Sequence, residues 1–172
     1  GRGTTDGYVS WQTGFRELAT YLGSQGYTKA ELYTTTWGPA DPNKASQNNH
    51  AKKYVLQMRA FVEAVLAYTK APQVNIIGHS MGVTIGRKVV KGGQAIDHTD
   101  GTYQVGASLR DKVKTFVGLA GANLGLTACF NGGVIPTCSN IDGFNPGEEL
   151  SPAYAADAGL RHDVGLSYAG SL

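Results

Sequence analysis

The chain has 172 residues, 41% of them hydrophobic, and a formal net charge of +2. This length and apolar content suffice for one buried core, so we expect a single domain spanning residues 1–172. A net charge this small, without Lys and Arg clustered among aromatic residues, argues against nucleic-acid binding, and the longest apolar runs are far too short to span a membrane.

The first half of the chain predicts a helix, a strand and a second helix. The start, "GRGTTDGYVSW", is polar and has no signal-peptide pattern, and "SWQTGFRELATYLGSQGY" places its apolar residues on one helical face. "AELYTTTW" is rich in β-branched and aromatic residues, which predicts a strand. In "NNHAKKYVLQMRAFVEAVLAYTKA" apolar residues recur at i, i+3, i+4 and i+7, which predicts a long helix capped by Asn48 or Asn49.

The second half continues the alternation. Val74 to Ile77 form a short apolar run, as expected for a strand covered on both faces. From Met81 the apolar period becomes helical, and Gly92-Gly93 ends that helix. We expect an irregular excursion or a hairpin in "AIDHTDGTYQVGA", a buried strand in "KTFVGLAGAN", and mostly loop after Gly121. This order predicts an α/β fold, a three-layer parallel sheet with helices on both faces.

One serine has the sequence context of a catalytic nucleophile. Ser80 is the centre of G-x-S-x-G, "GHSMG", between a predicted strand and a predicted helix. Such an elbow turns sharply, strains the serine backbone and needs glycine two positions to either side. The Met81 N–H, at the helix start, would stabilise an oxyanion. The bare pattern also arises by chance, so the interpretation depends on the strand and helix around it.

A nucleophilic serine needs a histidine base and an acid that orients the base. In this type of site the acid precedes the histidine in the sequence. His162 satisfies that order with Asp142 or Asp157, although no predicted strands separate these residues. His98 precedes the required acid and is expected to be a solvated loop residue.

The other two histidines are not expected to be the base. His79 adjoins the serine, and its ring is expected to pack beside the site or line it, whereas His50 is expected at the surface near a helix start. No metal site is predicted: Asp97 and Asp100 in "DHTDG" lack the remaining ligands of a calcium loop, so we expect a solvated turn. No cofactor is predicted either, because no phosphate-binding glycine loop occurs.

Two cysteines leave two alternatives open. Cys129 and Cys138 lie nine positions apart across a Gly-Gly turn, and no histidine flanks them as in a zinc site. They either close a small disulfide loop, which would imply an oxidising compartment, or remain two free thiols.

Three blocks of the sequence resemble the class 2 lipases, which are small secreted triacylglycerol lipases. The blocks are "FRELATYLGSQGYTKAELYTTTWG", "VNIIGHSMGVTIGRKVVKGG" and "VKTFVGLAGANLGL", and the resemblance covers roughly residues 3–151. It implies an α/β-hydrolase fold and a secreted lipase or esterase of lipid catabolism, acting on acyl esters or lipids without a cofactor. It matches Ser80 to the nucleophile and Met81 to the residue whose amide holds the oxyanion.

Measured against this family, the chain is expected to be a fragment, incomplete at both ends. The family begins with a strand that leads into a His-Gly oxyanion element, and it continues with further strands that carry the acid and the histidine. Residues 158–172 are an unrecognised tail, so the base is expected outside the chain, with His162 as the lesser alternative. An acyltransferase on the same fold, and a non-catalytic binding module without a base, remain open alternatives. The resemblance therefore implies activity for the parent protein rather than for this chain alone.

Overall fold

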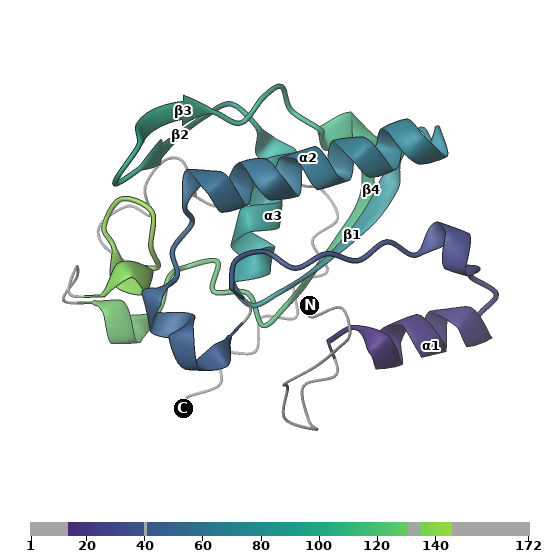
Figure 1. Cartoon of the computed structure of the whole chain (residues 1–172), viewed down its shortest axis with the longest axis horizontal. Helices are drawn as coiled ribbons and strands as arrows, with labels where there is room; N and C mark the ends of the chain where they lie inside the picture. Colours follow the sequence, from purple (N-terminus) through teal and green to yellow (C-terminus); the bar gives the residue numbers. More distant parts are fainter. Residues whose placement is uncertain (1–13, 40, 131–134, 146–172) are drawn as a thin grey trace. The chain divides into compact units, whose positions relative to one another are not determined.

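The computed structural model describes residues 14–39, 41–130 and 135–145. The chain divides into two compact units, Gly1–Ala40 and Asp41–Leu172, which are described separately (Figure 1). In the first unit the predicted helix is present as α1 (Arg16–Ser24), followed by a 3-10 turn, η1 (Lys29–Glu31). The strand predicted over residues 30–37 is wrong, because these residues form η1 and irregular backbone. An extended segment becomes a strand only by pairing, and the described part of this unit offers it no partner strand.

The second unit begins with a 3-10 helix, η2 (Pro42–Gln47), and the long predicted helix, α2 (Lys52–Thr69). The predicted cap at Asn48 or Asn49 is wrong, because the N-cap residue is Ala51, whose side chain cannot accept a hydrogen bond. Asp97, from a distant segment, accepts the Lys52 N–H at 2.7 Å instead. The two asparagines are buried, and their side chains bond elsewhere in the unit.

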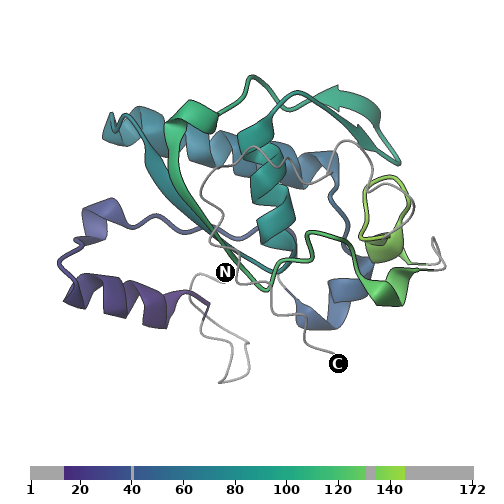
Figure 2. The ribbon, with the colours of Figure 1, turned by 180° about the vertical axis from the view of Figure 1, so that it is seen from behind.

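Two parallel strands and one helix form the centre of this unit. They are β1 (Val74–His79), α3 (Met81–Lys91) and β4 (Val113–Leu119), as the sequence predicts, with His79 opposite Leu119 in the parallel register. The excursion between α3 and β4 is an antiparallel hairpin of β2 (Gln94–Asp97) and β3 (Gly101–Gln104). Figure 2 shows α3 from the side opposite to α2, and α3 contacts α2, β1 and β4. Within the described residues the parallel sheet has two strands, so the three-layer sheet remains a prediction.

The core of this unit lies between α3 and the parallel strands. It is formed by Val83, Val90 and Phe116, with Ile76 and Val113 packed against them. Close packing here depends on small residues on β4. A Cβ atom on Gly118 would lie 2.8 Å from the Val83 side chain, so the bare glycine lets the first turn of α3 approach the end of the strand.

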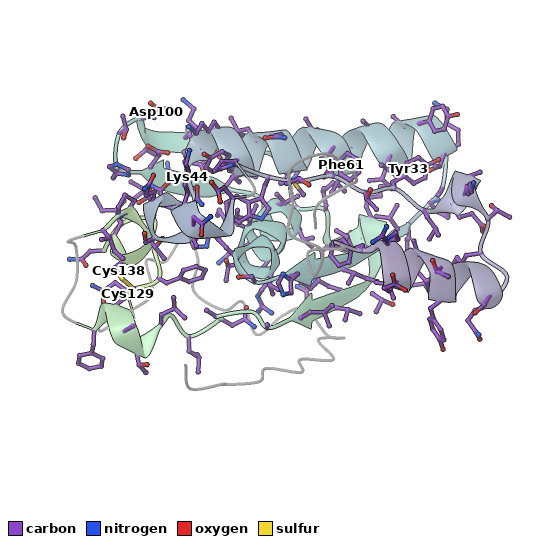
Figure 3. All side chains as sticks on the ribbon, turned by 60° about the horizontal axis from the view of Figure 1, so that its bottom comes forward. Tyr33, Lys44, Phe61, Asp100, Cys129 and Cys138 are labelled. Carbon is purple, nitrogen blue, oxygen red and sulfur yellow. A yellow bond between two sulfur atoms is a disulfide. The ribbon has the colours of Figure 1, made fainter. Side chains whose placement is uncertain are left out.

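The described residues after β4 form loops with two 3-10 turns, η4 (Thr127–Cys129) and η5 (Pro136–Cys138). Cys129 and Cys138 form a disulfide that joins them, drawn in yellow in Figure 3. Of the two alternatives that the sequence left open, the structure has the disulfide. Among the described residues, no helix combines the length and apolar character needed to cross a membrane.

We expect the Cys129→Ala/Cys138→Ala double variant to be less stable than the parent chain by about 2.5–3 kcal/mol, because opening so short a loop restores entropy to the unfolded chain. Urea unfolding of both proteins, followed by circular dichroism, measures the difference. A matched control is the parent chain kept in reductant, which should unfold like the double variant. Equal midpoints for the oxidised parent and the double variant would contradict the expectation.

Candidate functional site

The chain changes from strand to helix at a single residue, Ser80. β1 ends at His79, α3 begins at Met81, and Ser80 between them has φ 54° and ψ −133°. A side chain at positive φ is strained, and such strain persists only where surrounding contacts fix it. Here the Ser80 N–H donates to Leu119 O at 2.9 Å, and Ser80 O accepts the Val83 N–H at 2.9 Å. Ser80 is exposed, so the bend presents this residue to solvent.

Glycine before the serine is required by the closeness of β1 and α3. A Cβ atom on Gly78 would lie 3.0 Å from both Gly82 O and Val83 Cα. Both of these are backbone atoms, which cannot move aside as the end of a flexible side chain could. The spacing of the pattern thus reflects a strand and a helix that touch at their junction.

The start of α3 supplies hydrogen-bond donors beside Ser80. Met81 is the first residue of the helix, and the first N–H groups of a helix have no acceptor within it. The helix dipole also places partial positive charge at this end. The negative charge of an oxyanion on a carbonyl group attached to Ser80 would therefore be stabilised at this end of the helix.

The predicted partners of Ser80 are only partly within the described residues. Asp142 is described, whereas His162 and Asp157 lie outside, so their pairing is not observed. His79 is exposed next to Ser80. In the part of the chain that the structure describes, no hydrogen bond joins the Ser80 hydroxyl to a histidine.

The prediction that His50 is a surface residue is wrong, because only 1% of it is exposed. Its Nδ1 donates to the backbone carbonyl of Asp142 at 2.8 Å, and its Nε2 lies 2.6 Å from Thr84 Oγ1. Burial lowers the pKa of His50 to about 4, so the ring is neutral at neutral pH. A neutral ring that donates through Nδ1 carries no proton on Nε2, so Nε2 faces the Thr84 hydroxyl, which also lies 2.9 Å from the Met81 carbonyl. These two partners allow an imidazole to be buried under the first turn of α3.

The prediction of a solvated His98 is also wrong in part. Its side chain is 47% exposed, but its Nδ1 lies 2.9 Å from Oδ2 of the fully buried Asp142. The hydrogen bond to this carboxylate raises the pKa of His98. Asn49 also donates to Asp142 Oδ2, at 2.9 Å. Sequence reasoning missed this group because Asp142 is 44 positions from His98 and 93 from Asn49.

A protein-family model matches most of the chain. The model described as Lipase (class 2) matches residues 4–154, the greater part of the sequence. This confirms the resemblance noted in the three sequence blocks. A comparison with curated proteins gives no match.

Proposed function

The chain belongs to the class 2 lipase family, and on this premise we propose that it acts through Ser80 as a nucleophile on carboxylic esters. Membership of the family indicates a lipase- or esterase-type hydrolase with a lipid or ester substrate. The observation that supports a role for Ser80 is its backbone conformation: φ 54° in an exposed residue between β1 and α3. Strain of this kind at a strand–helix junction is the setting of a nucleophile elbow.

The proposed reaction proceeds in two halves. Ser80 Oγ attacks the ester carbonyl carbon while its proton passes to a histidine base, and the Met81 N–H stabilises the oxyanion. The bond to the alcohol then breaks, the alcohol leaves with that proton, and an acyl group remains on Ser80. Water gives a proton to the same base and attacks the acyl carbon. The bond from that carbon to Ser80 Oγ then breaks, the base returns the proton to Oγ, and the carboxylic acid leaves.

The base is proposed to be a histidine beyond the described residues. His50 and His98 are engaged with Thr84 and Asp142, and neither bonds to Ser80. Within this sequence the remaining candidate is His162. A His162→Gln variant assayed beside the parent chain measures its contribution, since loss of a base costs several orders of magnitude in rate.

The loop after β4 supports contact with an apolar substrate. It starts directly after Leu119, whose carbonyl accepts the Ser80 N–H. Leu124 and Phe130 on this loop are 79% and 75% exposed, so both side chains can contact an apolar substrate. We also propose that the protein is secreted, because the Cys129–Cys138 disulfide is of the kind that persists in oxidising compartments.

The proposal is tested with a fluorophosphonate that reacts with activated serines. We expect one adduct per chain, located on Ser80 by peptide mass spectrometry, and none in Ser80→Ala. Ser108→Ala is the matched control, because Ser108 is an exposed serine outside the elbow, and it should label like the parent.

Two other results would point elsewhere. Absence of any adduct both in this chain and in a longer chain that carries the base would contradict an activated serine and favour a non-catalytic binding module, whereas labelling of the longer chain alone would support the fragment interpretation. Labelling of Ser80 together with acyl transfer to an added alcohol in preference to water would favour an acyltransferase.

A further inference from the structure

Three separate segments bring ligand-type side chains together at the start of α2. The segment before α2 contributes Asn49, the β2–β3 hairpin contributes Asp97 and His98, and the loop after the disulfide contributes Asp142. Figure 3 labels Asp100, which marks the hairpin turn beside the first turn of α2. Ligand atoms of Asp97, His98 and Asp142 all lie within 4.8 Å of one another. This group, with Asn49, is called the Asp142 cluster.

Three polar atoms of the Asp142 cluster lie within hydrogen-bonding distance of one another. Asn49 Nδ2, His98 Nδ1 and Asp142 Oδ2 form a triangle with sides of 3.0, 2.9 and 2.9 Å. If His98 Nδ1 carries a proton, it donates to the carboxylate but faces the Asn49 amide donor. If it carries none, it accepts from Asn49 but its lone pair faces the carboxylate oxygen. Rotating the Asn49 amide by 180° does not help, because its carbonyl oxygen would then face the Asp142 carboxylate.

The carboxylate of Asp142 also has an oxygen without a partner. Asp142 is 0% exposed, and its Oδ1 is buried with no hydrogen-bond partner among the described residues. Oδ2 of the same group is in the triangle with His98, so the carboxylate faces the cluster. A buried carboxylate with an unsatisfied oxygen is costly unless a cation lies beside it. Asp97, 5% exposed, adds a second carboxylate to the same place.

We propose that the Asp142 cluster binds a divalent transition-metal ion of the Zn²⁺ type through Asp142, His98 and Asp97. Two ligands of a tetrahedral Zn²⁺ ion lie about 3.4 Å apart, so His98 Nδ1 and Asp142 Oδ2, which are 2.9 Å apart, need to separate only slightly to hold the ion. The ion removes the conflict, because His98 Nδ1 and the Asp142 oxygen both direct lone pairs at it. The turned amide of Asn49 would present its carbonyl oxygen to the same ion.

The ligand chemistry selects the class of metal. One imidazole nitrogen with carboxylate oxygens suits Zn²⁺ and related transition metals, whereas Ca²⁺ and Mg²⁺ favour sites built from oxygen alone. Asp97 is held in place for this role, because its oxygens accept the N–H groups of Lys52, Thr99 and Asp100 at 2.7–2.8 Å. Each oxygen of a carboxylate has two lone pairs, so Oδ2, with one of these bonds, keeps one for a metal.

The proposed ion is structural. The backbone carbonyl of Asp142 bonds His50, and His50 contacts Thr84 on the first full turn of α3. An ion on Asp142 therefore links the loop, the hairpin and α2 to the helix that begins beside Ser80. We expect it to stabilise this part of the fold without touching the substrate.

The test is zinc binding by the full chain after chelator treatment, measured by isothermal titration calorimetry and by metal content after dialysis. We expect one equivalent of Zn²⁺ and a higher thermal unfolding midpoint with Zn²⁺ but not with Ca²⁺. His98→Gln should weaken Zn²⁺ binding by about tenfold or more and abolish the zinc-dependent shift. Since His98 is half-exposed, this variant should fold even if Asp142→Asn does not.

Asp111→Asn is the matched control, because Asp111 is an exposed acid in a 3-10 turn outside the cluster. It should bind zinc like the parent. The proposal is overturned if the parent binds no Zn²⁺, if His98→Gln binds it as tightly as the parent, or if Ca²⁺ produces the same shift. If the parent binds no Zn²⁺, the contact between His98 and Asp142 is an ordinary ion pair.

Discussion

In a protein that carries its histidine base, ester hydrolysis is expected to fall by roughly 10⁴-fold or more when Ser80 is replaced by alanine, because the covalent route is then lost. The residual rate would come from substrate binding and from the N–H donors at the start of α3. A short-chain chromogenic ester measures kcat/KM for the parent and the variant. The change should appear in kcat rather than in KM, since the Ser80 hydroxyl acts on the bound substrate.

Ser80→Gly provides a second, independent measurement at the same position. It lacks the nucleophile as Ser80→Ala does, but glycine adopts φ 54° without strain. We therefore expect Ser80→Gly to be more stable than Ser80→Ala by about 1 kcal/mol in urea unfolding. Ser24 in α1 gives the matched control, because there the order should reverse, with glycine less stable than alanine.

Two results would count against this account of Ser80. Hydrolysis by Ser80→Ala at the parent rate would remove the serine from the mechanism. If the alanine variant were more stable than the glycine variant at Ser80, as is expected at Ser24, the backbone of Ser80 would not be strained.

The elements that the sequence predicted correctly are those whose signal is local. α2 and α3 have apolar residues at helical spacing, and β1 and β4 are short apolar runs between turn formers. The segment at residues 32–37 has equally good strand composition, yet composition does not provide a partner strand. The cap of α2 was missed for the same reason, since Asp97 reaches it from 45 positions away.

The same distinction between local and distant signals applies to the candidate site. Ser80 and its flanking glycines are contiguous, so strand, bend and helix could be predicted from one short stretch. The Asp142 cluster could not, because its members come from three segments and each has an ordinary local context. "DHTDG" indicated a solvated turn, and no neighbouring residue in the sequence indicates that Asp142 contacts this turn. A buried acid bonded to a histidine becomes visible only when the chain is folded.

Gly78→Ala is expected to destabilise the protein by about 3 kcal/mol and to slow phosphonate labelling of Ser80 by roughly 10²-fold. The added methyl group would meet Gly82 O and Val83 Cα at 3.0 Å, so β1 and α3 must separate. That movement changes the orientation of the Ser80 side chain relative to the Met81 N–H, because these two residues join the strand to the helix. Urea unfolding and the rate of adduct formation measure the two effects.

The control for this substitution is Gly23→Ala in α1, where an added Cβ meets nothing within 4 Å and the backbone is helical. Alanine there should leave labelling unchanged and increase stability by about 0.5–1 kcal/mol. The comparison separates a general effect of alanine from the contact at the elbow. If Gly78→Ala retained both the stability and the labelling rate of the parent, the strand and helix would not need to touch, and the tight junction would not be what positions Ser80. A loss of labelling in a variant of unchanged stability would show instead that the contact acts on the geometry of the serine alone.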